Sequence, residues 1–171
     1  SLLIALERNQ RHAEDGETGS IHDWLGEAYR GQNKLDLAIE HGELGVRLKK
    51  KYWGEVPNTL FAQLHLGQVY RLAGKYSQAE TMDREALTLA EKLYPAGNDA
   101  TLADAYEQLA NVQSANLNKV DEAVDNYKKA LKCSISARVV KDPKTKKVHD
   151  RLISVLRANG RASEASEIPP L

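Results

Sequence analysis

The sequence repeats itself about every 42 residues, and this periodicity restricts the fold more than any other feature of the chain. Leu25-Gly26-x-x-Tyr29 returns as Leu66-Gly67-x-x-Tyr70. One small residue recurs at intervals of 41, 44 and 42 residues, at Ala38, Ala79, Ala123 and Ala165. The longer interval indicates an insertion near residues 116–118. Self-similarity at a fixed period is the signature of an array of stacked supersecondary units.

Each repeat predicts two antiparallel helices that approach closely. Leu25 and Tyr29 are four residues apart and share a helix face, and small residues such as Gly26 permit close contact. Gly31, Gly74 and Gly160 fall where short turns are expected, and Pro57, Pro95 and Pro143 fall between repeats. No segment shows strand periodicity. The predicted helices are 2–14, 19–31, 35–52, 58–73, 76–93, 99–115, 120–140, 145–158 and 161–168.

The charge composition excludes several kinds of partner. The chain has 24 Lys and Arg against 24 Asp and Glu, so its formal net charge is zero. A broad nucleic-acid footprint or a polybasic membrane contact would need a basic excess. No apolar run approaches the roughly 20 residues of a membrane helix. We therefore expect neither a nucleic acid nor a membrane as partner, and a protein or peptide instead.

Catalytic and metal-binding motifs are missing from the sequence. A single cysteine, Cys133, excludes an intramolecular disulfide and a multi-thiolate zinc site, and fits a reducing compartment. The five histidines form no i,i+4 pair that could hold a metal. We expect no enzyme activity, no catalytic residue, no cofactor and no metal. The lysine cluster 141–147 is interpreted as a solvated loop between repeats. We expect a cytoplasmic protein. Because it opens on a helical pattern without Met, we expect a fragment of a longer one.

The repeat resembles the tetratricopeptide repeat, whose first helix carries W-x-x-L-G-x-x-Y and whose second carries Ala. The stretches 66–70, 74–80 and 86–87 carry the resemblance best, and the period of about 42 residues is similar to the kinesin-light-chain-like branch. The links between repeats, 53–57 and 94–98, depart from the Leu-Gly-x-x-His-Pro pattern of that branch. The resemblance implies an all-α fold, a right-handed superhelical solenoid of antiparallel helix pairs.

The repeat boundaries define one array fragment over residues 1–171. We expect a half repeat at 1–18, repeats at 19–57, 58–98 and 99–143, and a degenerate or capping repeat at 144–168.

The resemblance also implies a concave groove lined by the first helix of each pair. Aligning the repeats predicts a peptide-binding set consisting of Trp24, Glu27, Arg30, Phe61, Leu64, His65, Gln68, Arg71, Gln108, Asn111, Lys147, Arg151 and Arg157. Arg30, Arg71 and Arg157 share one repeat position, and guanidinium groups there could bind peptide carboxylates. Asp23, Glu107 and Asp150 share another, seven residues earlier, so mutual neutralisation is the competing interpretation. For Trp24 the competing interpretation is packing between repeats.

These residues favour a non-catalytic adaptor or cargo-recognition module that binds acidic peptides with a large apolar anchor. One alternative is a structural scaffold or oligomerisation segment of a larger regulatory protein, with weak self-association through exposed solenoid ends. A minor alternative is a carboxylate-clamp co-chaperone, because Lys147 and Arg151 fall on two basic positions of that clamp. Leu64 and Gln68, however, replace its expected Lys and Asn.

Overall fold

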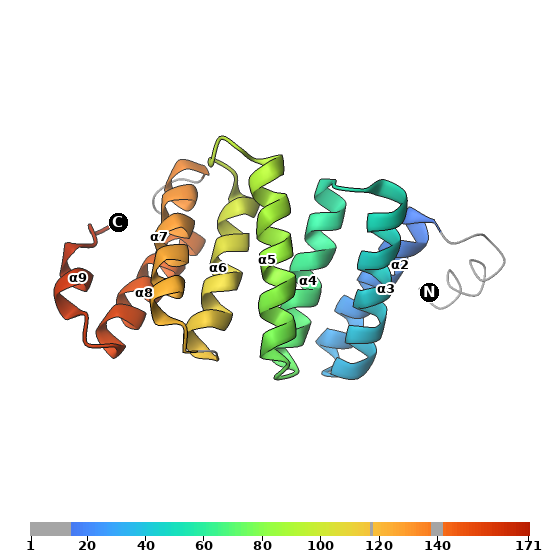
Figure 1. Cartoon of the computed structure of the whole chain (residues 1–171), viewed down its shortest axis with the longest axis horizontal. Coiled ribbons are helices and arrows are strands. Elements are labelled where there is room, and N and C mark those ends of the chain that lie inside the picture. The colour runs from blue at the N-terminus through green and yellow to red at the C-terminus, as the bar shows by residue number, and fades with distance from the viewer. Residues whose placement is uncertain (1–14, 117, 138–141) are drawn as a thin grey trace. The chain divides into compact units, whose positions relative to one another are not determined.

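A computed structural model of the chain describes residues 15–116, 118–137 and 142–171, and these contain helices but no strand (Figure 1). Each repeat contributes a pair of helices. The elements are α2 (Gly16–Gly31), α3 (Leu35–Trp53), α4 (Pro57–Leu72), α5 (Tyr76–Leu93), α6 (Ala100–Ala115), α7 (Val120–Ala137), α8 (Pro143–Ala158) and α9 (Ala162–Glu167). The all-α prediction is confirmed. The predicted helix 2–14 lies outside the described residues, as do 138–140 of another.

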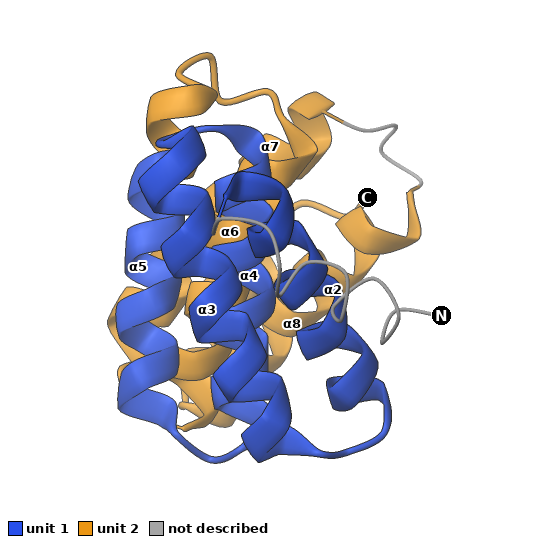
Figure 2. Ribbon diagram, turned by 90° about the vertical axis from the view of Figure 1, so that its right-hand side faces the viewer, with its two compact units in different colours: residues 1–89 blue, residues 90–171 orange. Residues whose placement is uncertain are grey.

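The chain divides into two compact units, residues 1–89 and 90–171 (Figure 2). In the first unit α2 packs on α3, and α4 contacts both. In the second unit α6 packs on α7, α7 on α8 and α8 on α9. The first core includes the fully buried Leu48, Leu60 and Leu66, and the second includes Val124 and Leu152.

Glycines show that α2 and α3 run antiparallel and in close contact. A Cβ added at Gly26 would lie 3.2 Å from the backbone oxygen of Ala38, near the start of α3. A Cβ at Gly45, further along α3, would lie 2.9 Å from the backbone nitrogen of Asp23. The contact thus moves backward along α2 as it moves forward along α3. Ala79 and Gly67, which the repeat placed at a close helix contact, are both buried.

Capping residues set the helix ends and explain the small differences from prediction. Asp15 accepts a hydrogen bond from the Thr18 N–H at 2.7 Å, so α2 begins at residue 16 rather than 19. Pro57 and Pro143 are first residues of α4 and α8, not residues between repeats, because proline tolerates the first helical turn. The left-handed turn residue after α2 is Asn33, with φ 57°, instead of Gly31. Its repeat equivalents Gly74, Asn118 and Gly160 also have positive φ.

Candidate functional site

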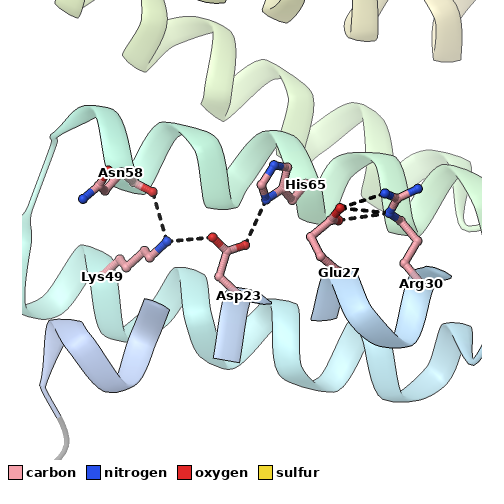
Figure 3. A network of polar contacts seen from close by, with 6 residues as sticks. All are labelled: Asp23, Glu27, Arg30, Lys49, Asn58 and His65. Atoms are coloured by element: carbon pink, nitrogen blue, oxygen red, sulfur yellow. Dashed lines mark hydrogen bonds and ion pairs between the residues drawn. The ribbon is translucent and has the colours of Figure 1, made fainter. Parts of the chain in front are cut away.

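Asp23 lies at the centre of a polar network that joins three helices of the first unit (Figure 3). Its carboxylate, on α2, is 6% exposed. Oδ2 accepts a hydrogen bond from Nζ of Lys49 on α3 at 2.7 Å, and Oδ1 lies 3.1 Å from Nδ1 of His65 on α4. Lys49 is 3% exposed and also donates to the backbone oxygen of Asn58 at 3.3 Å. Each of the three helices therefore contributes one side chain to a single cluster, in which Asp23 and Lys49 are buried and His65 is partly exposed.

The network favours the charged forms of Asp23 and His65. Burial alone would raise the pKa of Asp23, but hydrogen bonds from His65 and Lys49 outweigh it and leave the pKa below its ordinary value. The hydrogen bond to Asp23 raises the pKa of His65, against the opposing effect of burial. His65 is predicted as a groove residue, and the structure commits its Nδ1 to this buried contact.

Glu27 and Arg30 neutralise each other on α2 (Figure 3). Arg30 Nε lies 3.0 Å from Glu27 Oε1, and Arg30 Nη2 lies 2.8 Å from Oε2. Both residues were predicted to line the groove, and in the structure they bind each other through two hydrogen bonds. The neutralisation expected between arginines and acids therefore occurs here, although the acid is Glu27 and not Asp23.

The second unit contains a similar buried acid, Glu107 on α6. The residue is 8% exposed, and its Oε1 accepts a hydrogen bond from Nη1 of Arg151 on α8 at 2.9 Å. Lys147 Nζ lies 3.3 Å from the same oxygen. Arg151 Nη1 also donates to Oδ1 of Asn111, which accepts a further bond from the Tyr127 hydroxyl at 2.8 Å. Three predicted groove residues of this unit, Asn111, Lys147 and Arg151, thus lie together.

The two buried acids, Asp23 and Glu107, occupy equivalent positions in their repeats, and the same position corrects the expectation for Leu64. Asp23, Leu64 and Glu107 occupy one repeat position, and they are 6%, 4% and 8% exposed. In each unit the base that binds the acid lies on the first helix of the following repeat. His65, which binds Asp23, follows the equivalent residue Leu64, and Arg151, which binds Glu107, follows the equivalent residue Asp150. In these three repeats the position therefore serves helix contact, and Leu64 belongs to the core and not to an open groove surface. The equivalent residue of the fourth repeat, Asp150, is exposed.

The other predicted residues keep exposed surface. Trp24 is 61% exposed and Phe61 41%. Trp24 therefore does not pack between repeats, contrary to the competing interpretation. Gln68, Arg71 and Gln108 are half-buried, and Arg157 is exposed. Among the described residues, neither Arg71 nor Arg157 has a carboxylate within ion-pair distance.

A cavity of about 420 Å³ opens on the surface of α8. Its walls include Pro143, Lys146, Lys147, Asp150 and Arg151. The side chains of Lys147 and Arg151 are 55% and 40% exposed, although both also contact Glu107. The basic side chains outnumber the acidic ones around this opening, in a chain whose formal net charge is zero.

The described residues contain no group of three His, Cys, Asp or Glu side chains that could hold a metal ion. Cys133 is buried, and burial raises the pKa of its thiol, which lowers its nucleophilicity at neutral pH. In the same part of the chain, no helix combines the length and apolarity needed to cross a bilayer. Of the lysine cluster predicted as a loop, Lys144, Lys146 and Lys147 lie in helix α8, because Asp142 caps a helix that begins at Pro143, and Lys141 lies outside the described residues.

Lys49 is the network residue that sequence reasoning missed. A signal exists, because Lys49 is four residues after Gly45 and so shares the helix face that packs against α2. A lysine on such a face needs a buried acid as partner.

Comparison with known proteins identifies the class. A sequence profile described as the tetratricopeptide repeat matches residues 17–92 and 58–136. Together these matches span more than half of the chain, which therefore belongs to the tetratricopeptide repeat family. No curated protein matches the sequence.

Solved structures share the fold of this chain, and two of those that follow are named as kinesin-light-chain proteins. A putative kinesin light chain from Podosopora anserina, with nearly identical TPR-like repeats, has TM-score 0.80 and 21% identity, covering 91% of this chain and 74% of its own. BtubC (BKLC) from P. vanneervenii has TM-score 0.86 and 22% identity, covering 98% and 67%. The apo form of RapI has TM-score 0.83 and 12% identity, covering 98% and 58%. The predicted fold class, a solenoid of helix pairs, is confirmed by this likeness. A fold of this class indicates a protein-interaction or scaffold module and is generally non-catalytic.

Proposed function

We propose that this chain is a non-catalytic peptide-binding module whose ligand is an acidic segment with a large apolar anchor. The observation that carries this proposal is the α8 cavity, whose walls include Lys146, Lys147 and Arg151 and one acid, Asp150, which is paired with Lys146 at 2.9 Å. Arg151 uses Nη1 for Glu107 and Asn111, and no hydrogen bond within the described residues occupies its other nitrogens. A peptide carboxylate can accept charge-assisted hydrogen bonds from that free edge and from Lys147.

The first unit has candidate contacts of its own for an apolar side chain of a ligand. Trp24 on α2 and Phe61 on α4 are large and exposed, and such aromatic residues are enriched among the residues that dominate binding energy. Leu64, which was also predicted to line the groove, is not among these contacts because its side chain is buried. Its burial also weakens the carboxylate-clamp alternative, since no cation stands at that position.

The test measures peptide affinity at two salt concentrations. The peptides pair one Trp with flanking Asp and Glu; control peptides replace the acids by Asn and Gln, or the Trp by Ser. We expect Lys147→Ala to weaken binding of the acidic peptide roughly 3–10-fold and to reduce its salt dependence. Trp24→Ala should weaken binding of the Trp peptide whose acids are replaced, without changing its salt dependence. Lys75→Ala, which removes an exposed lysine that lines neither cavity, is the matched control and should leave affinity unchanged.

Two outcomes would redirect the assignment. If neither Lys147→Ala nor Trp24→Ala alters binding, the scaffold or oligomerisation alternative replaces this proposal, and sedimentation of the whole chain then measures self-association. If binding requires a free peptide C-terminus, so that amidation abolishes it, the carboxylate-clamp alternative replaces it.

A further inference from the structure

The second unit has a separate cavity of about 480 Å³, bordered by the end of α5, by α6 and by α7. Leu102, Tyr106 and Cys133 contribute buried side chains, at 4%, 8% and 7% exposure. The link Tyr94–Gly97 forms one side, and Lys129 and Lys132 lie on the α7 side. The volume falls in the range of small-molecule sites, roughly 300–1,000 Å³, and mainly apolar walls with a few charged groups are typical of such sites.

The Tyr106 ring is held in a defined orientation within this cavity. Its hydroxyl donates a hydrogen bond to Glu91 Oε1 at 2.5 Å, and burial together with Glu91 raises the pKa of the phenol, which keeps it a donor. Lys129 Nζ lies 5.5 Å from the centre of the ring. The only acid among the lining residues, Glu91, is thus already engaged by Tyr106.

The equivalent place in the first unit shows what is different here. There, Lys50 Nζ and Glu85 Oε2 form an ion pair at 2.6 Å, and Gln63 lies 3.4 Å from the same oxygen. The repeat register aligns Lys50 with Glu91, Gln63 with Tyr106 and Glu85 with Lys129. The acid and the lysine have therefore exchanged positions between the two units, and in the second unit the acid, Glu91, is hydrogen-bonded to Tyr106. Within the described residues Lys129 and Lys132 consequently have no carboxylate at ion-pair distance.

We propose that this cavity binds a small aromatic carboxylate. The ligand carboxylate lies between Lys129 and Lys132 and forms ion pairs with them, as Glu85 does with Lys50 in the first unit. The ring of the ligand packs on Tyr106 and Tyr94, where offset stacking adds to apolar burial. The site is separate from the α8 cavity, so it does not depend on the proposed peptide function.

Cys133 gives a local measurement, because it is the single cysteine of the chain and lines this cavity. The probe is naphthalene-2-carboxylate, and the readout is the rate at which neutral iodoacetamide alkylates Cys133 in the whole chain. We expect saturable protection by the probe. Naphthalene-2-methanol, which has the ring without the charge, should bind about tenfold more weakly. This factor in Kd corresponds to a difference of about 1.4 kcal/mol in binding free energy. Cyclohexanecarboxylate, which has the charge without the aromatic ring, should also bind more weakly.

The lysine variants distinguish this site from general stabilisation. In Lys129→Gln/Lys132→Gln, the probe should bind no better than its alcohol, whereas Lys75→Gln, at an exposed lysine outside both cavities, should behave as wild type. Chemical shifts of the Gly97 and Ser136 amides provide a second readout that does not need thiol chemistry, and they should move with the same affinity. Equal protection by the carboxylate and the alcohol, or no shift at these amides, would overturn the proposal.

Discussion

A single buried carboxyl, Asp83 on α5, makes the stability of the first unit dependent on pH. Asp83 is 2% exposed, and its Oδ1 has no hydrogen-bond partner within the described residues. The carboxyl lies directly against Gly67 of α4, where any side chain would collide with it. Burial raises the pKa of Asp83 to about 7; the charge of Arg71 opposes this rise and that of Glu80 adds to it.

We expect Asp83→Asn to stabilise the protein, and increasingly so as the pH rises. A carboxyl whose pKa is higher in the folded than in the unfolded state favours folding at low pH. That contribution is lost as the pH rises from about 4, near the unfolded pKa, to about 7. Urea denaturation should show the variant about 1–3 kcal/mol more stable at pH 8, with the smallest difference near pH 4. Asp36→Asn, at an exposed position of α3, should show no such trend.

The buried pair Asp23–Lys49 should be costly to break but inexpensive to replace. Removing Lys49 leaves Asp23 buried with His65 as its remaining partner, so Lys49→Met should lower the free energy of unfolding by up to about 3–5 kcal/mol. Leu64 shows that an apolar residue is accepted at the repeat position of Asp23. The double variant Asp23→Leu/Lys49→Met should therefore recover most of the loss in a double-mutant cycle. A double variant as unstable as Lys49→Met alone would contradict this explanation.

Helix packing in the first unit depends on glycines that local propensity would not favour. Alanine is normally better than glycine inside a helix by about 1 kcal/mol. At Gly45, however, an added Cβ would lie 2.9 Å from the Asp23 nitrogen and 3.0 Å from the Gly19 oxygen, both backbone atoms. At Gly31, the last residue of α2, nothing lies within 4 Å.

These two positions give a matched prediction. Gly45→Ala should lower the free energy of unfolding by about 1–3 kcal/mol, because α2 and α3 must move apart. Gly31→Ala should be neutral or stabilising by up to about 1 kcal/mol. Thermal denaturation of both variants measures the difference, and equal melting temperatures would show that the helix contact tolerates a methyl group.

Much of the secondary structure was predictable, because each helix carries its own start and stop signals. The repeat located the elements from α2 to α9, and the remaining differences come from caps such as Asp15 and from Pro57 at a first helical position. The site was less predictable. A repeat register says which residues are equivalent, not which way they face. It placed Leu64 in the groove, whereas the equivalent acids Asp23 and Glu107 are buried against the next first helix.

Across the whole molecule, charge is balanced in total and uneven locally. The 24 basic and 24 acidic residues cancel, so any electrostatic attraction of a ligand arises from local arrangements such as the α8 cavity. The repeat boundaries, the groove set and the cytoplasmic location stay predictions. Each unit contains a buried acid on the first helix of a repeat, Asp23 in residues 1–89 and Glu107 in residues 90–171. Each also contains one further equivalent place, which the Lys50–Glu85 ion pair fills in the first unit and where the 480 Å³ cavity lies in the second.

The bond from the acid of one first helix to a base of the following one has a consequence for how such a chain can change over generations. Asp23 finds its base in His65, and Glu107 finds its base in Arg151, each in the succeeding repeat. A genetic exchange that moved the first repeat away from the second would take His65 from Asp23 and leave it Lys49 alone. One that moved the third repeat away from the fourth would take both Arg151 and Lys147 from the buried Glu107. Exchanges at these two boundaries should therefore be tolerated less well than a copy of the second repeat, whose equivalent residue is Leu64.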